Sequence, residues 1–210
     1  MAAVSHPDVL QLPPVSDAGS QWLLDHLSAH LDAAHALAEV LPAVRAVGAL
    51  LCERFAAGGH VYGFGNGGSA ADAQHLTGEL IGHYKRSRRP LPAVTLTTDP
   101  TVMTCIANDY SFADVFSRQI SALVRAGDVV VAFTTSGQSA NVVAGLRAGR
   151  AVGAATVLFG GGHGGSAAAY ADHLLLSPSE QTPRIQEMHT LMLHMGSAYV
   201  DSWAAGEQPA

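Results

Sequence analysis

Short segments made almost wholly of apolar residues recur along this chain, and they constrain its fold more than any other feature. The spacing predicts buried strands at residues 60–64, 93–97, 128–133, 155–159 and 172–176, with helical patterns over 70–81, 140–151 and 184–203. Apolar strands that alternate with helices are typical of a parallel sheet covered on both faces. We therefore expect an α/β chain with such a sheet at its centre.

The first part of the chain has a different pattern. Apolar residues, mostly leucines, recur at three- and four-residue spacing from Leu23 to Leu37, which predicts a helix. Pro42 is expected to begin a second helix that ends near Ala57. Residues 1–20 contain several prolines and are interpreted as a flexible tail. Nothing after them resembles a linker, so residues 21–205 are expected to form one domain with an N-terminal helical extension.

Composition narrows the function classes. The chain is 48% hydrophobic and only 13% charged, with a formal net charge of −6, which excludes a disordered chain and argues against nucleic acid or membrane as a partner. The basic cluster at residues 85–89 is interpreted as a solvated loop. Cys52 and Cys105 form no metal-binding pair and are expected to be buried thiols. No leader-like segment is recognised, so we expect a cytoplasmic protein.

Two predicted loops follow strands and carry small or polar residues. Residues 65–69 read Gly-Asn-Gly-Gly-Ser, without the spacing of a dinucleotide site or the lysine of a P-loop, which disfavours NAD and ATP. Residues 134–139 place four hydroxyl side chains before a helix. Hydroxyls and a helix N-terminus can hold a phosphate monoester. Helix capping is the alternative, but one cap needs only one hydroxyl, so we favour an anion site.

Several histidines and carboxylates lie on the predicted helices. His75 and Glu79 share one helix face at i, i+4, and this pair alone could be either a metal half-site or an ordinary surface pair. His26, His30 and His35 have no partner at metal-binding spacing and are expected at the surface or at an interface.

The motifs together resemble a known family. In order, they are Gly-Asn-Gly-Gly-Ser-x-x-Asp-Ala-x-His from Gly65, residues 107–112 with 116–118, Thr-Ser-Gly-x-Ser-Ala-Asn from Thr135, and Arg-Ile-Gln-Glu-x-His from Arg184 with His194. Over residues 20–200 this pattern is similar to sugar isomerase (SIS) domains, and within them to the phosphoheptose isomerases. The resemblance implies a single three-layer αβα SIS domain with a five-stranded parallel, flavodoxin-like sheet.

The same resemblance implies a reaction and a metal. Members convert D-sedoheptulose 7-phosphate to D-glycero-D-manno-heptose 7-phosphate through an enediol, with Glu79 matching the base and His194 the acid. One Zn²⁺ per subunit is implied, held by His75, Glu79, Gln186 and His194. Gln186 and His194 are roughly 12 Å apart along an ideal helix, so they can share a metal only at a distorted helix start or between subunits. His189 is expected to be structural.

The resemblance also implies a substrate-binding set and an assembly. The implied substrate-binding residues are Asn66, Gly67, Gly68, Ser69, Glu79, Asn108, Asp109, Thr134, Thr135, Ser136, Ser139 and Gln186. A homotetramer with sites at subunit boundaries is expected. Pro183 and His83 depart from the pattern of some relatives and could alter substrate choice.

The main alternative is a non-catalytic homologue that binds a protein partner such as a replication initiator. The residues implied for metal binding and acid–base chemistry are all present, which favours the enzyme.

Overall fold

The computed structural model describes residues 18–207. Most of the predicted tail, residues 1–17, lies outside them. The first helix, α1, begins at Ala18, three residues earlier than expected, and runs to Ala36. It is followed by a 3₁₀ turn, η1 (Leu37–Val40), and by α2 (Leu41–Ala56), which has Pro42 in its first turn as predicted.

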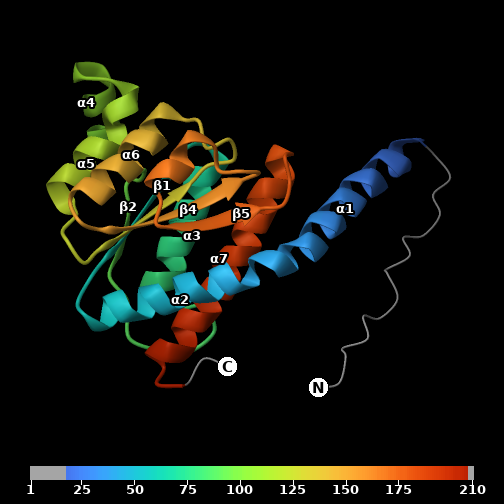
Figure 1. The fold of residues 1–210 in the computed structure, drawn as a ribbon, viewed down its shortest axis with the longest axis horizontal. Helices are drawn as coiled ribbons and strands as arrows, with labels where there is room; N and C mark the ends of the chain where they lie inside the picture. The colour runs from blue at the N-terminus through green and yellow to red at the C-terminus, as the bar shows by residue number, and fades with distance from the viewer. Residues whose placement is uncertain (1–17, 208–210) are drawn as a thin grey trace.

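A five-stranded parallel sheet forms the centre of the fold (Figure 1). Its strands are β1 (Val61–Gly65), β2 (Ala93–Thr95), β3 (Val129–Phe133), β4 (Ala155–Gly161) and β5 (His173–Ser177). The order is β2-β1-β3-β4-β5 and every neighbouring pair is parallel, which confirms the flavodoxin-like prediction. The chain reverses its direction of travel across the sheet between β1 and β3. Ligands of such sheets bind in the crevice at the carboxyl ends of these two strands.

The two faces of the sheet carry separate hydrophobic cores. Val129, Val131 and Phe133 of β3 pack with α2, with α3 (Gly68–Ile81) and with α7 (Thr182–Ala204). Val130 and Ala132 point to the other face, where α4 (Pro100–Asp109), α5 (Val115–Leu123) and α6 (Ala140–Ala151) lie. This alternation along one strand is what a sheet covered on both faces requires, so the three-layer prediction is confirmed.

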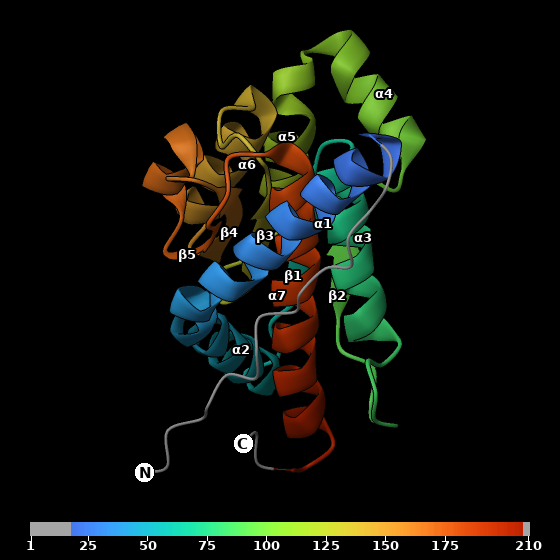
Figure 2. The same cartoon turned by 90° about the vertical axis from the view of Figure 1, so that its right-hand side faces the viewer.

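Helix α1 extends beyond the body of the molecule and crosses α7 (Figures 1 and 2). Arg184 of α7 donates to the backbone carbonyl of His26, and His30 Nδ1 lies 2.7 Å from Glu187 Oε2. The apolar side chains of Trp22 and Leu23 are 60% and 61% exposed. Gly19–Ala56 has the length and composition of a membrane span, which is weak evidence because core helices pass the same test. The second half of this segment is α2, which packs in the hydrophobic core.

No helix was predicted between residues 98 and 127, yet α4, the 3₁₀ turn η2 (Phe112–Asp114) and α5 lie there. A local signal marks the start of α4. The Asp99 carboxylate accepts hydrogen bonds from the backbone N–H groups of Thr101 and Val102, and Pro100 occupies the first helical position. A further 3₁₀ turn, η3 (Gly165–Tyr170), follows the glycine-rich segment after β4.

Candidate active site

A polar pocket of about 110 Å³ lies at the carboxyl ends of β1 and β3. It is lined by Asn66, Ser69, Phe133, Thr134, Thr135, Ser136, Ser139 and Gln186. Both loops singled out in the sequence therefore meet at one place, the position where the strand order reverses. None of the lining side chains carries a formal charge, so any anion bound here would be held by hydroxyls, amides and backbone N–H groups.

The first loop depends on glycine at close contacts. A Cβ on Gly65 would lie 2.6 Å from the backbone oxygen of Ser69 and 2.8 Å from that of Phe133, and Gly67 has a φ of 56°. These glycines let β1 turn sharply into α3. Asn66 then exchanges two amide hydrogen bonds, of 2.8 and 2.9 Å, with Asn141 on α6. The amide pair ties the first loop to the second, and sequence reasoning did not find Asn141 as part of the site.

The second loop leaves hydroxyl hydrogens available for a ligand. Thr134 Oγ1 accepts from the N–H of Gly137 at 3.1 Å, and Ser136 Oγ accepts from the N–H of Gln138 at 3.2 Å. An oxygen that accepts in this way still has its own hydrogen to donate. Ser139 is the N-cap residue of α6, but its side chain makes no capping bond. Capping therefore does not account for these hydroxyls, which agrees with the predicted anion site.

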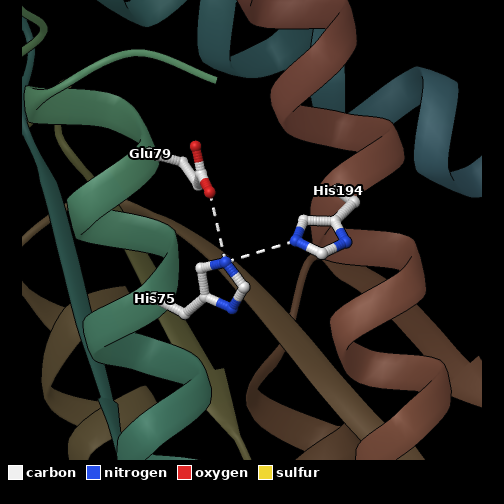
Figure 3. Close-up of side chains that lie close together, drawn as sticks. All are labelled: His75, Glu79 and His194. Carbon is white, nitrogen blue, oxygen red and sulfur yellow. Dashed lines mark hydrogen bonds and ion pairs between the residues drawn. The ribbon is translucent and has the colours of Figure 1, made fainter. Parts of the chain in front are cut away.

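A second cluster joins α3 to α7 (Figure 3). His75 Nε2 lies 3.1 Å from Glu79 Oε1 and 3.2 Å from His194 Nε2. One donor atom from each residue lies within 4.8 Å of the others, and all three side chains are half-buried. The donor atoms around a tetrahedral Zn²⁺ are about 3.3 Å apart for bonds near 2.0 Å. Two imidazole nitrogens and a carboxylate oxygen at these spacings fit a metal ion, and they favour that interpretation of the His75–Glu79 pair.

The surroundings of His194 favour its uncharged form. Burial lowers the pKa of His194, and the neighbouring His75 lowers it further, while Glu79 acts in the opposite direction. A neutral imidazole can offer a lone pair to a metal or an N–H to a substrate oxygen.

Gln186 lies with the polar pocket. A Cβ on Gly68 would be 2.3 Å from Gln186 Nε2, so the amide lies directly against the start of α3. Helix α7 runs without interruption from Thr182, and Gln186 and His194 are eight positions apart in it, about 12 Å along the axis. The structure does not place Gln186 among the three grouped side chains, and its role as a metal ligand stays a prediction.

Asn108 and Asp109 lie at the end of α4, and they do not line the polar pocket. Asn108 Nδ2 donates to Asp109 Oδ1 at 2.7 Å in an exposed position. Among residues 18–207, neither residue lines the polar pocket, so their contact with a sugar stays a prediction.

Two interpretations of single residues were wrong. The side chain of Arg88, taken as part of a solvated loop, is 1% exposed and pairs with the fully buried Asp201, with 3.0 Å between Nε and Oδ1. Cys52 is buried as expected, but Cys105 is exposed. His189 is fully buried and bonds the Gly160 carbonyl through Nε2, which agrees with a structural role.

Comparison with known proteins gives a consistent result. The SIS domain family model matches residues 30–161. The phosphoheptose isomerase of Roseiflexus sp. is 43% identical over 181 residues, covering 86% of this chain and 92% of that protein. That of Aquifex aeolicus is 49% identical over 138 residues, covering 66% of this chain and 72% of its own.

Solved structures show the same likeness. The phosphoheptose isomerase of Neisseria gonorrhoeae has a TM-score of 0.83 and 37% identity, covering 88% of this chain and all of the other. That of Francisella tularensis has a TM-score of 0.86 and 29% identity, covering 89% of this chain and all of the other. The chain therefore belongs to the SIS domain family and, within it, to the phosphoheptose isomerases, which are aldose–ketose isomerases.

Proposed function

We propose that this isomerase converts D-sedoheptulose 7-phosphate to D-glycero-D-manno-heptose 7-phosphate. The observation that carries the proposal is that α3 and α7 together present two different binding surfaces. Ser69 and Gln186 contribute to the polar pocket, and Glu79 and His194 lie further along the same two helices.

The separation of the two surfaces suits a seven-carbon sugar phosphate. Along their helix axes, Ser69 and Glu79 are about 15 Å apart and Gln186 and His194 about 12 Å apart, and side chains can shorten both spans. An extended heptose 7-phosphate measures about 10 Å from phosphorus to C1, from bond lengths near 1.5 Å. A phosphate in the polar pocket thus leaves C1 and C2 close to Glu79 and His194.

The phosphate end relies on hydrogen bonds. We assign the phosphate to the hydroxyls of Ser69, Thr134, Thr135, Ser136 and Ser139 and to the N-terminus of α6. The positive end of the α6 dipole favours an anion there, and Asn66 is held beside it by Asn141. We assign Asn66, Gly67, Gly68 and Gln186 to the sugar side of the same pocket.

The isomerisation end needs a base and an acid. We assign Glu79 as the base that removes the proton from C1 of the ketose and returns it to C2. His194 donates a proton to the C2 oxygen and accepts the one released from the C1 hydroxyl. The Glu79 side chain is 18% exposed and so remains accessible to a substrate. Burial and the neighbouring His75 lower the pKa of His194, which favours the neutral imidazole that can donate an N–H.

His75, Glu79 and His194 would hold a Zn²⁺ ion, with Gln186 as the predicted fourth ligand. When bound, the ion would polarise the substrate carbonyl. The donor set and its spacings, described above, support this assignment.

We also propose a cytoplasmic homotetramer with sites at subunit boundaries. The exposed apolar side chains of Trp22, Leu23 and Leu27 on α1 support an interface there. Light scattering on the full chain should give the mass of four subunits, and a fully active monomer would contradict the assembly. The grouping of His75, Glu79 and His194 disfavours the alternative of a non-catalytic protein-binding homologue, which has no use for these residues.

The decisive experiment is to incubate the purified, Zn²⁺-supplied protein with sedoheptulose 7-phosphate and to follow the appearance of an aldose heptose phosphate by NMR. A folded protein that releases no aldose would contradict the proposed function.

A further inference from the structure

The loop over residues 82–91, which follows α3, is tied to α7 by one buried carboxylate. Asp201 of α7 accepts hydrogen bonds from the backbone N–H groups of Tyr84, Lys85 and Arg86, at 3.4, 3.0 and 2.7 Å, and from Arg88 Nε at 3.0 Å. Its side chain is fully buried. Burial opposes ionisation of Asp201, but these hydrogen bonds outweigh it and hold its pKa below the usual value. The group is therefore a carboxylate.

Arg88 extends this connection to the end of α3. Its two terminal nitrogens donate to the backbone carbonyls of Glu79 at 2.6 Å and Leu80 at 2.7 Å. The last carbonyls of a helix have no partner within the helix, so the guanidinium caps them. The Asp201–Arg88 pair thus links the turn that carries Glu79 to the helix that carries His194.

The same loop places an aromatic ring on His194. The ring of Tyr84 stacks on the His194 imidazole, with centroids 5.4 Å apart and 29° between the planes. His75 meets the His194 ring edge-on, at 4.8 Å and 80°. Metal-binding histidines are usually oriented by a hydrogen bond from their second ring nitrogen. Within residues 18–207, no protein group is bonded to that nitrogen of His194, so ring contacts have to orient it.

We propose that Tyr84 is a positioning residue, which fixes the plane of the His194 imidazole, and that Asp201 and Arg88 hold Tyr84 in place. The role rests on one part of the proposed function, namely that His194 binds the metal. An imidazole lone pair lies in the ring plane, so rotation about the side-chain bonds would turn it away from the ion. Stacking against a fixed ring restricts that rotation.

The test compares two substitutions of the same residue. Tyr84→Leu keeps apolar volume but removes the aromatic face, whereas Tyr84→Phe keeps the face and removes only the hydroxyl. Zn²⁺ affinity of the metal-free protein is measured by competition with a chelator, and kcat and KM are measured at saturating Zn²⁺. We expect Tyr84→Leu to weaken Zn²⁺ binding by about 10- to 100-fold, the usual effect of removing a group that orients a ligand.

We expect kcat to fall with Zn²⁺ affinity while KM changes little, because the phosphate pocket is untouched. Tyr84→Phe should stay within about threefold of the wild type in both measurements. Tyr170→Leu, the same change on the opposite face of the sheet, is the matched control.

Asp201→Asn is an independent test of the proposal, since it removes the charge that organises the loop but keeps the size of the side chain. Its effect on Zn²⁺ affinity should not add to that of Tyr84→Leu, because both act through one element.

Wild-type Zn²⁺ affinity in folded Tyr84→Leu, or an equal loss in Tyr84→Phe, would overturn the inference. If the wild type binds Zn²⁺ but does not isomerise the heptulose phosphate, the proposed function fails and the positioning role remains. If the wild type binds no Zn²⁺, the inference is overturned as well.

Discussion

The two ends of the proposed site are built in different ways. In the phosphate loop, residues 134–139, the hydroxyls of Thr134 and Ser136 are held by near neighbours in the sequence, through the Thr134–Gly137 and Ser136–Gln138 hydrogen bonds. The metal end depends on residues more than a hundred positions apart, including His75 with His194 and Arg88 with Asp201. Substitutions in the first end should therefore alter ligand binding, whereas substitutions in the second should also alter catalysis and stability.

The largest expected effect is on catalysis at the metal end. Glu79→Gln keeps the size and one oxygen of the side chain but removes the proton acceptor, so kcat should fall by about 10²- to 10⁴-fold. KM should change little, since the phosphate pocket is intact. Steady-state kinetics measure kcat and KM, and exchange of the C1 proton with deuterated solvent measures removal of that proton.

Glu53→Gln on α2, with a side chain that is 72% exposed, is the matched control and should retain full activity. Normal turnover and normal exchange in Glu79→Gln would assign the base to another residue, with His194 and Asp109 as the next candidates.

The next effect is on stability and concerns two arginines of one basic cluster. Arg88→Ala would leave the buried Asp201 carboxylate without its charged partner and should lower the free energy of unfolding by about 3–5 kcal/mol. Arg86→Ala removes only the exposed pair with Glu207 and should cost about 0–1 kcal/mol. Urea denaturation measures both. Equal decreases in the free energy of unfolding of the two variants would mean that the burial of Arg88 does not determine its contribution to stability.

At the phosphate end, Ser136→Ala and Ser139→Ala should each weaken substrate binding by about 1–3 kcal/mol, because a phosphate oxygen would lose a hydrogen-bond donor. Binding measured by calorimetry should show the loss, with little change in the melting temperature. Ser121→Ala, on α5 and outside the pocket, is the control. Unchanged affinity in both pocket variants would contradict the assignment of this loop to the phosphate.

The smallest expected effect is a pH dependence of stability at the metal end. The pKa of Asp201 is lowered from 3.8 in the folded protein, so its stabilising contribution is complete above that value and is lost as pH falls through the folded pKa. The side chains that line the phosphate pocket do not titrate in this range. The free energy of unfolding, measured at pH 6 and below pH 4, should therefore decrease less on acidification in Asp201→Asn than in the wild type. An identical decrease in both proteins would mean that Asp201 does not contribute to the acid destabilisation.

Much of the architecture follows from local patterns. Each strand is a short apolar run, and alternate side chains of β3 enter opposite cores as the parallel-sheet prediction requires. Helices α4 and α5 were missed, although Asp99 and Pro100 mark the start of α4 in the sequence itself. This start is encoded locally, because the N-cap residue and the proline lie next to each other in the chain.

Other features depend on distance in space. Asn66 and Asn141 are 75 residues apart, and only the pairing of β1 with β3 brings their amides together. The neighbouring arginines Arg86, Arg88 and Arg89 look alike in the sequence, yet the side chain of Arg88 alone among the three is buried against an aspartate 113 residues away. No local pattern distinguishes them, because burial is set by the packing of α7 on α3.

The sequence by itself determined the parallel sheet, the glycine turn after β1, the hydroxyl-rich loop after β3 and the shared helix face of His75 and Glu79. These features depend on strand and helix periodicity and on backbone freedom, which act over a few residues. Only the tertiary structure decided that His194 meets His75, that Gln186 lies against Gly68, and that Tyr84 covers His194. Those contacts require two helices to pack at one register, and that register is set by the side chains of the whole core.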